Sequence, residues 1–171
     1  MPIFNPTNYV EKTTALHADD GILIFDSEDS NEIKYAKPDT VYPAGAIVGG
    51  CENGVIPASS TRYLPIMAWG TPDATELDTQ AVWPVPGNLS YFVVRTRSAQ
   101  PGTGSLVFTV RVASADTSLV VTVDASAAAG NHSDTTHVVP ITFWQGLSIK
   151  VVNNASSDSA QIAVWTIKQS Q

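Results

Sequence analysis

Two histidines flank an aspartate in the segment His132–His137 (HSDTTH), and imidazole together with carboxylate is the donor set that binds Zn²⁺. Along an extended strand, however, residues five apart point to opposite faces unless the chain folds back between them. The sequence has no neighbouring cysteine or further histidine to complete a tetrahedral shell. We therefore interpret His132, Asp134 and His137 as polar loop residues, and we expect neither a metal nor a cofactor here.

A second candidate is the oxygen-rich segment Asp26–Glu32 (DSEDSNE), since carboxylates are the ligands that calcium prefers. The segment lacks both the glycine and the ligand spacing of an EF-hand loop. It lies between two short apolar runs, where a polar, solvated hairpin tip is the ordinary finding. We expect a hairpin tip, with a weak calcium site as the alternative.

The remaining motifs that could carry catalysis are incomplete, so we expect that the protein is not an enzyme. Cys51 lies between glycines, but no positioned histidine partner can be identified for it. The turn Pro101–Gly104 (PGTG) lacks the Lys-Ser/Thr pair of a phosphate-binding loop, and no Gly-x-Ser-x-Gly elbow occurs. Of four tryptophans, only Trp144 is a candidate sugar contact, and packing is the favoured interpretation even for it; Trp165 alternates within a strand and is expected to pack.

Composition sets the wider limits. The chain has 171 residues, 43% of them hydrophobic, and a single cysteine, so we expect a real core without disulfides. Residues 1–80 carry 12 acidic and 4 basic side chains, whereas residues 81–171 carry 4 and 5. An acidic half without a basic cluster argues against nucleic acid as a partner. Neither a secretion signal nor an apolar run of about 20 residues is present, so we expect no membrane partner.

The second half of the chain alternates between apolar and polar residues with the period of a β-strand. In Ser105–Ala113, for example, Leu106, Phe108, Val110 and Val112 share one face. A polar turn at Ser114–Thr117 follows. About eight short strands separated by turns predict an antiparallel β-sandwich. The predicted strands are Arg62–Trp69, Gln80–Val85, Leu89–Arg97, Ser105–Ala113, Leu119–Val123, Thr136–Ile141, Leu147–Val152 and Gln161–Ile167.

Some of these strands are apolar on both faces, which predicts a covered outer face. A strand of a sandwich usually leaves one face to water, so a second apolar face needs a cover. A neighbouring subunit is the favoured cover, with the chain's own loops or N-terminal segment as the alternative. The expected subunit interface comprises Tyr91, Phe92, Val94, Val120 and Trp165.

The first half is less regular. Gly21–Asp26 and Glu32–Ala36 predict a hairpin with an acidic tip, ended by Pro38. From Tyr42 to Ser60, prolines and glycines indicate an extended connector that docks against a partner or a sister subunit, with docking onto the chain's own second half as the alternative. We therefore expect two parts, an N-terminal anchoring arm over residues 1–60 and a sandwich over residues 61–171.

Two stretches resemble proteins of tailed-bacteriophage particles. Thr14–Lys34 resembles the short acidic hairpin near the N-termini of phage fibre and head-decoration proteins. Gly104–Asp124 resembles a strand-turn-strand element, T-x-R-V-x-x-A-D-T-x-L-x-V-T-V, of phage virion jelly rolls, whose knobs are similar to the trimeric tumour-necrosis-factor and C1q heads. The chain departs from many fibres in having no shaft of heptads or Gly-x-y repeats between arm and knob.

The resemblance implies a non-enzymatic virion protein: a jelly-roll homotrimer that decorates or cements the capsid surface, with the major capsid protein or another virion protein as partner. The alternative is a receptor- or glycan-binding tip of a tail or head fibre, for which an exposed Trp144 or Tyr91 in a groove is the discriminating feature. The residues of the arm expected to dock on the capsid are Phe4, Tyr9, Asp19, Asp20, Asp26, Glu28 and Asp29.

Overall fold

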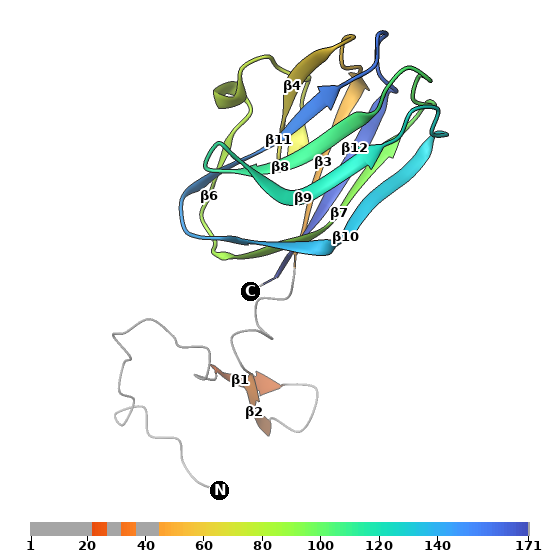
Figure 1. The fold of residues 1–171 in the computed structure, drawn as a ribbon. Coiled ribbons are helices and arrows are strands. Elements are labelled where there is room, and N and C mark those ends of the chain that lie inside the picture. The colour runs from red at the N-terminus through yellow and green to blue at the C-terminus, as the bar shows by residue number, and fades with distance from the viewer. Residues whose placement is uncertain (1–21, 27–31, 37–44, 171) are drawn as a thin grey trace, which may run out of the picture. The chain divides into compact units, whose positions relative to one another are not determined.

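The computed structural model describes residues 22–26, 32–36 and 45–170, and the chain divides into two units, Met1–Pro43 and Ala44–Gln171, each taken here by itself (Figure 1). In the first unit, β1 (Ile22–Asp26) and β2 (Glu32–Ala36) form an antiparallel pair with Asp26 opposite Glu32. These two strands fall within the residues that the sequence assigns to a hairpin. The other expected docking residues, Phe4, Tyr9, Asp19, Asp20, Glu28 and Asp29, lie outside the described residues.

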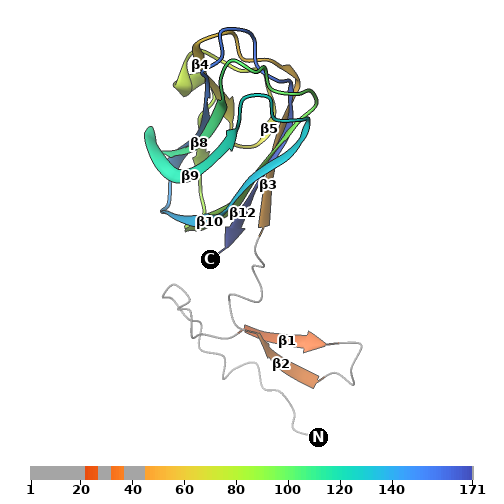
Figure 2. The same ribbon diagram turned by 45° about the vertical axis from the view of Figure 1, so that its right-hand side comes forward.

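The second unit is all-β and consists of two mostly antiparallel sheets, as the alternating pattern predicts (Figure 2). One sheet has the strand order β10-β7-β12-β3-β5, and the other has the order β4-β11-β8-β9 with β6 also paired to β11. The strands are β3 (Gly45–Gly54), β4 (Ser60–Pro65), β5 (Ala68–Trp69), β6 (Ala81–Trp83), β7 (Gly87–Thr96), β8 (Leu106–Val112), β9 (Ala115–Val123), β10 (Gly130–Ile141), β11 (Gln145–Asn153) and β12 (Ile162–Ser170).

The antiparallel pairs of this unit are nested along the chain. The outermost strands pair with each other, β3 with β12, and successive inner pairs are β4 with β11, β7 with β10 and β8 with β9. Two further pairings, β12 with β7 and β11 with β8, join these four hairpin-like pairs into the two sheets. The inward residues of both sheets, among them Phe92, Phe108 and Trp165, form one buried core.

Residues 45–54 correct the predicted domain boundary. The sequence places them in an irregular connector, but they form β3 and pair with β12 inside the sandwich. Their glycines serve packing: a Cβ on Gly49 would lie 2.3 Å from Nε1 of Trp165, and one on Gly50 would lie 2.9 Å from the Trp69 ring. The compact unit therefore begins at Ala44 rather than at residue 61.

The turn between β8 and β9 is shorter than predicted. Ala113 and Ser114 have φ values of 49° and 62°, the conformation of a two-residue type I′ hairpin turn. Asp116 consequently lies within β9, opposite Arg111, instead of in a turn over residues 114–117. In the described residues, no helix is long and apolar enough to cross a membrane.

Candidate interaction surface

The HSDTTH segment builds a β-bulge whose polar centre is Asp134. Between Asp134 and Val138 the register of β10 against β7 shifts, and the buried Asp134 carboxylate fills the irregularity. It accepts hydrogen bonds from the backbone N–H of Thr136 at 3.1 Å and of His137 at 3.2 Å. It also accepts one from the N–H of Val120 in β9 at 3.0 Å. Since β9 and β10 belong to different sheets, this carboxylate ties the two layers together.

The charge of Asp134 is stabilised by these donors. Burial alone would raise the pKa of its carboxyl, but the N–H groups of Val120, Thr136 and His137 and the His137 ring, 2.8 Å away, outweigh burial and hold the pKa well below its usual range. His132 lies opposite Val94, and its buried Nε2 has no hydrogen-bond partner among the described residues, so it does not take part in this cluster of hydrogen bonds. Among the described residues, no group of three or more metal-ligating side chains is assembled.

Cys51 is a core residue, 1% exposed. Burial raises the pKa of its thiol to about 11, with Arg97 opposing the shift in part. At pH 7 roughly one thiol in ten thousand is then ionised, so the group is a poor nucleophile. The structure gives no support to a reactive cysteine.

We expect Cys51 to resist an aromatic disulfide reagent at pH 8 in the folded protein and to react at once in 6 M guanidinium chloride. The measurement is the absorbance of released thiolate against time. Reaction of the folded protein as fast as that of free cysteine would contradict the burial described here.

The outer face of the β4-β11-β8-β9 sheet carries acidic and basic side chains that pair with one another. Nε of Arg111 and Oγ of Ser148 each donate to Oε1 of Glu76 at 2.8 Å. Arg111 also pairs with Asp116, and Lys150 pairs with the other oxygen of Asp116. Burial would raise the pKa of Glu76, but its hydrogen bonds, chiefly from Arg111, lower it. The network fixes the 3-10 helix η2 (Glu76–Asp78) on the sheet, because Glu76 belongs to that helix.

The outer face of the other sheet is different. Along β3, β12 and β7, inward residues alternate with outward ones, and the outward residues are mainly aliphatic or aromatic. Val48, for example, lies opposite Thr166 and is 54% exposed. The only charges among its described side chains are cationic: Arg95, and Lys168, whose Nζ lies 5.3 Å from the Tyr91 ring centroid. We name this surface the apolar outer face; its members are Val48, Trp69, Tyr91, Val93, Val164 and Thr166.

The five predicted interface residues do not lie on one surface. Phe92, Val94 and Trp165 are core residues with at most 1% exposure, so the unit itself accounts for their apolar character. Val120 lies on β9, in the other sheet, where it pairs with Thr109. Tyr91, 51% exposed, belongs to the apolar outer face. A bulge separates it from its neighbour, since Tyr91 and Phe92 share the space opposite one residue of β12.

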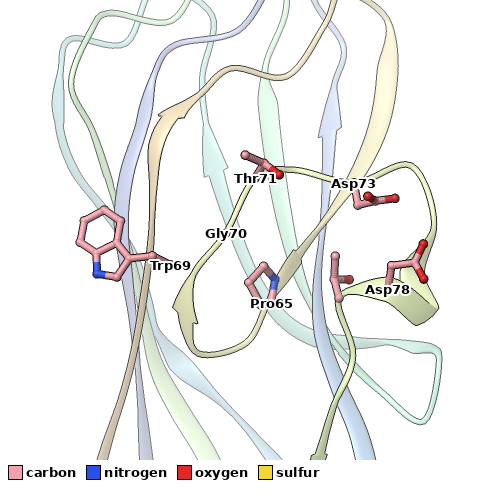
Figure 3. A pocket seen from close by; sticks show the side chains of 7 residues that line it. Pro65, Trp69, Gly70, Thr71, Asp73 and Asp78 are labelled. Atoms are coloured by element: carbon pink, nitrogen blue, oxygen red, sulfur yellow. The ribbon is translucent and has the colours of Figure 1, made fainter.

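A pocket of about 330 Å³ opens beside the apolar outer face, between β5 and η2. In Figure 3, Trp69 lies on one side of it and Asp73 and Asp78 lie on the other. Pro65, Gly70, Thr71 and Thr79 complete the lining. The pocket thus combines an aromatic ring with carboxylate and hydroxyl groups.

The exposed tryptophans are Trp69 and Trp144, at 68% and 71%. For Trp144 the sequence favours packing, with a sugar contact as the alternative, but the structure places it exposed in the turn before β11 with a φ of 64°. Trp165 is packed, as predicted. Sequence reasoning missed Trp69, although the glycine of β3 over which its ring lies, Gly50, is a weak signal that the strand makes room for a large side chain.

The fold and these surfaces define a β-sandwich with one charged, neutralised outer face and one apolar outer face. No protein-family model matches the chain, and no curated protein matches it.

Proposed function

We propose that the second unit is a jelly roll and that the chain is a non-enzymatic structural protein of a tailed-phage virion. The nested order of its strand pairs carries the proposal. A jelly roll forms when a long antiparallel hairpin wraps on itself, and it contains two Greek keys. In such a fold the first strand pairs with the last, the second with the next to last, and so on inward. The pairs β3 with β12, β4 with β11, β7 with β10 and β8 with β9 follow this order. Jelly rolls of this kind build viral capsid and lectin domains.

The proposed assembly is a homotrimer on the capsid surface. The apolar outer face supports self-association, because Val48, Trp69 and Tyr91 are each at least half exposed there, and exposed apolar surface is a usual mark of an interaction site. Three copies of the acidic N-terminal part would multiply weak contacts with a capsid protein through effective concentration. Its excess of 12 acidic over 4 basic side chains in residues 1–80 fits a basic patch as the partner surface.

Sedimentation equilibrium of the full chain tests the oligomer. We expect a mass three times 18.1 kDa at micromolar concentration, and a monomer would overturn the trimer. Binding to particles that lack the chain, measured at increasing salt, tests the docking. We expect binding to weaken as salt rises, and affinity independent of salt would exclude charge as its cause.

A second candidate function is a receptor- or glycan-binding fibre tip. Exposed aromatic side chains favour it, since an indole or phenol presented to solvent is a typical contact of a recognition surface. Trp69, Tyr91 and Trp144 are each at least half exposed. Of the three, only Trp69 lines the described pocket.

A further inference from the structure

We propose that the pocket between β5 and η2 is a subsite for a neutral, hydroxyl-rich oligosaccharide. The inference deepens the second candidate function and rests on its glycan-binding part alone, which a decoration protein can carry as well as a fibre tip. Three features support it: the pocket is held in shape, its lining suits sugar hydroxyls, and an aromatic ring continues from it.

The wall that carries Asp73 is held by backbone pairing. Its N–H donates to the Tyr63 carbonyl at 2.9 Å, and its carbonyl accepts from the Tyr63 N–H at 2.7 Å. These bonds attach the loop to β4, whose other side pairs with β11. Asp73 is therefore fixed relative to the sheet.

The wall that carries Asp78 is held by side chains. Glu76, two residues earlier in η2, is bound by Arg111 and Ser148, as described above. Thr79 is buried and bonds back to the Glu76 carbonyl through both its N–H, at 3.0 Å, and its hydroxyl, at 2.9 Å. A site whose walls are fixed before binding avoids much of the entropic cost of ordering them. The charged network thus acts as a support for the pocket.

Trp69 is placed by contacts with β3. β5 pairs in parallel with β3, and the N–H of Gly70 donates to the Gly50 carbonyl at 3.0 Å. The absence of a side chain on Gly50 lets the indole lie over the strand, within about 3 Å of where a Cβ would be. In Figure 3 the ring extends away from Asp73 and Asp78. The exposed indole therefore lies beside the pocket, where a second sugar ring can contact it, and does not occupy the pocket.

The lining selects the chemistry of the ligand. Asp73 uses Oδ1 to accept from the Thr75 N–H at 2.7 Å, and within the described part of the chain neither Asp73 nor Asp78 forms an ion pair. Carboxylates are strong acceptors for hydroxyl donors, and they repel carboxylate or phosphate groups. The apolar face of a following sugar ring suits the indole of Trp69. We infer a ligand of at least two sugar rings without anionic groups.

The experiment compares matched aromatic variants on a printed array of bacterial surface saccharides, neutral and anionic. The wild-type full chain is expected to bind neutral oligosaccharides. Trp69→Ala should weaken that binding by about tenfold or more, and Phe143→Ala, which removes an exposed aromatic ring outside the pocket lining, should leave it unchanged. Circular dichroism confirms that both variants fold. Loss of binding in Phe143→Ala but not in Trp69→Ala, or no neutral saccharide bound by the wild type, overturns the inference.

The carboxylates receive a separate test with the saccharide that gives the strongest array signal. Asp78→Asn is expected to weaken binding severalfold and to relax the rejection of anionic saccharides, whereas Asp124→Asn, an exposed carboxylate away from the pocket, should do neither. Unchanged binding in Asp78→Asn overturns the role of the pocket. Sedimentation of the same samples separates the outcomes: a trimer without saccharide binding refutes only this inference, and a saccharide-binding monomer refutes only the proposed assembly.

Discussion

Replacing Asp134 with alanine is expected to lower the free energy of unfolding by about 3–5 kcal/mol, because the change leaves several buried donors without an acceptor. The carboxylate serves the N–H groups of Val120, Thr136 and His137, and it links β9 of one sheet to β10 of the other. Urea denaturation followed by circular dichroism measures the difference. Asp124→Ala is the matched control, because Asp124 is exposed, and it should change stability by less than about 0.5 kcal/mol.

We also expect the contribution of Asp134 to the free energy of unfolding to depend on pH. The folded-state pKa of Asp134 is depressed, so the carboxylate's contribution is fully present above its unfolded pKa, near 4, and is lost progressively as pH falls below that value. The stability difference between wild type and Asp134→Asn should therefore be largest at neutral pH and should shrink from pH 4 toward pH 2. A difference that stays constant over this range would show that the charge of Asp134 is not what stabilises the bulge.

Gly49→Ala is expected to destabilise the sandwich by about 3 kcal/mol, at the upper end of overpacking effects. The added Cβ would lie 2.3–2.6 Å from three atoms of the Trp165 indole. The indole cannot move freely, because it is buried in the core and its Nε1 donates to the Ile66 carbonyl at 3.1 Å. Thermal or urea unfolding measures the loss.

Two comparisons identify the cause of the Gly49→Ala effect. Gly45→Ala in the same strand has open space around its new Cβ, and it should leave stability within about 0.5 kcal/mol of wild type. In a Trp165→Phe background, the penalty of Gly49→Ala should shrink, since the clashing atoms are gone. Equal penalties in the two backgrounds would mean that the clash with the indole is not the reason.

Local alternation was sufficient to predict most strands, including β8, β11 and β12, because each presents one apolar side to the core. It failed at β3, because the glycines of this strand make room for the rings of Trp165 and Trp69, which are distant in the sequence. It also failed to separate outward from inward residues where bulges break the alternation. At Tyr91 the alternation slips by one residue, so Leu89 and Phe92, three residues apart, both lie in the core, whereas Tyr91 is exposed.

The pocket had no sequence signal of this kind. Its residues lie in an aperiodic segment, and it forms only because distant groups hold that segment. Asp73 depends on pairing with Tyr63, and η2 depends on Arg111 and Ser148 in two strands far along the chain. The types of residue present, an aromatic with carboxylates and hydroxyls, were visible in the sequence, but their convergence was not.

The central claim, that this chain is a structural protein of a virion, is tested most directly by imaging. The proposal assigns the chain to a tailed phage, and particles of that phage would be labelled with gold-conjugated antibody against the sandwich and examined by electron microscopy. The proposal predicts label distributed over the head. Label confined to the tail would contradict capsid decoration and favour the fibre-tip function, and particles without label would contradict a virion role altogether.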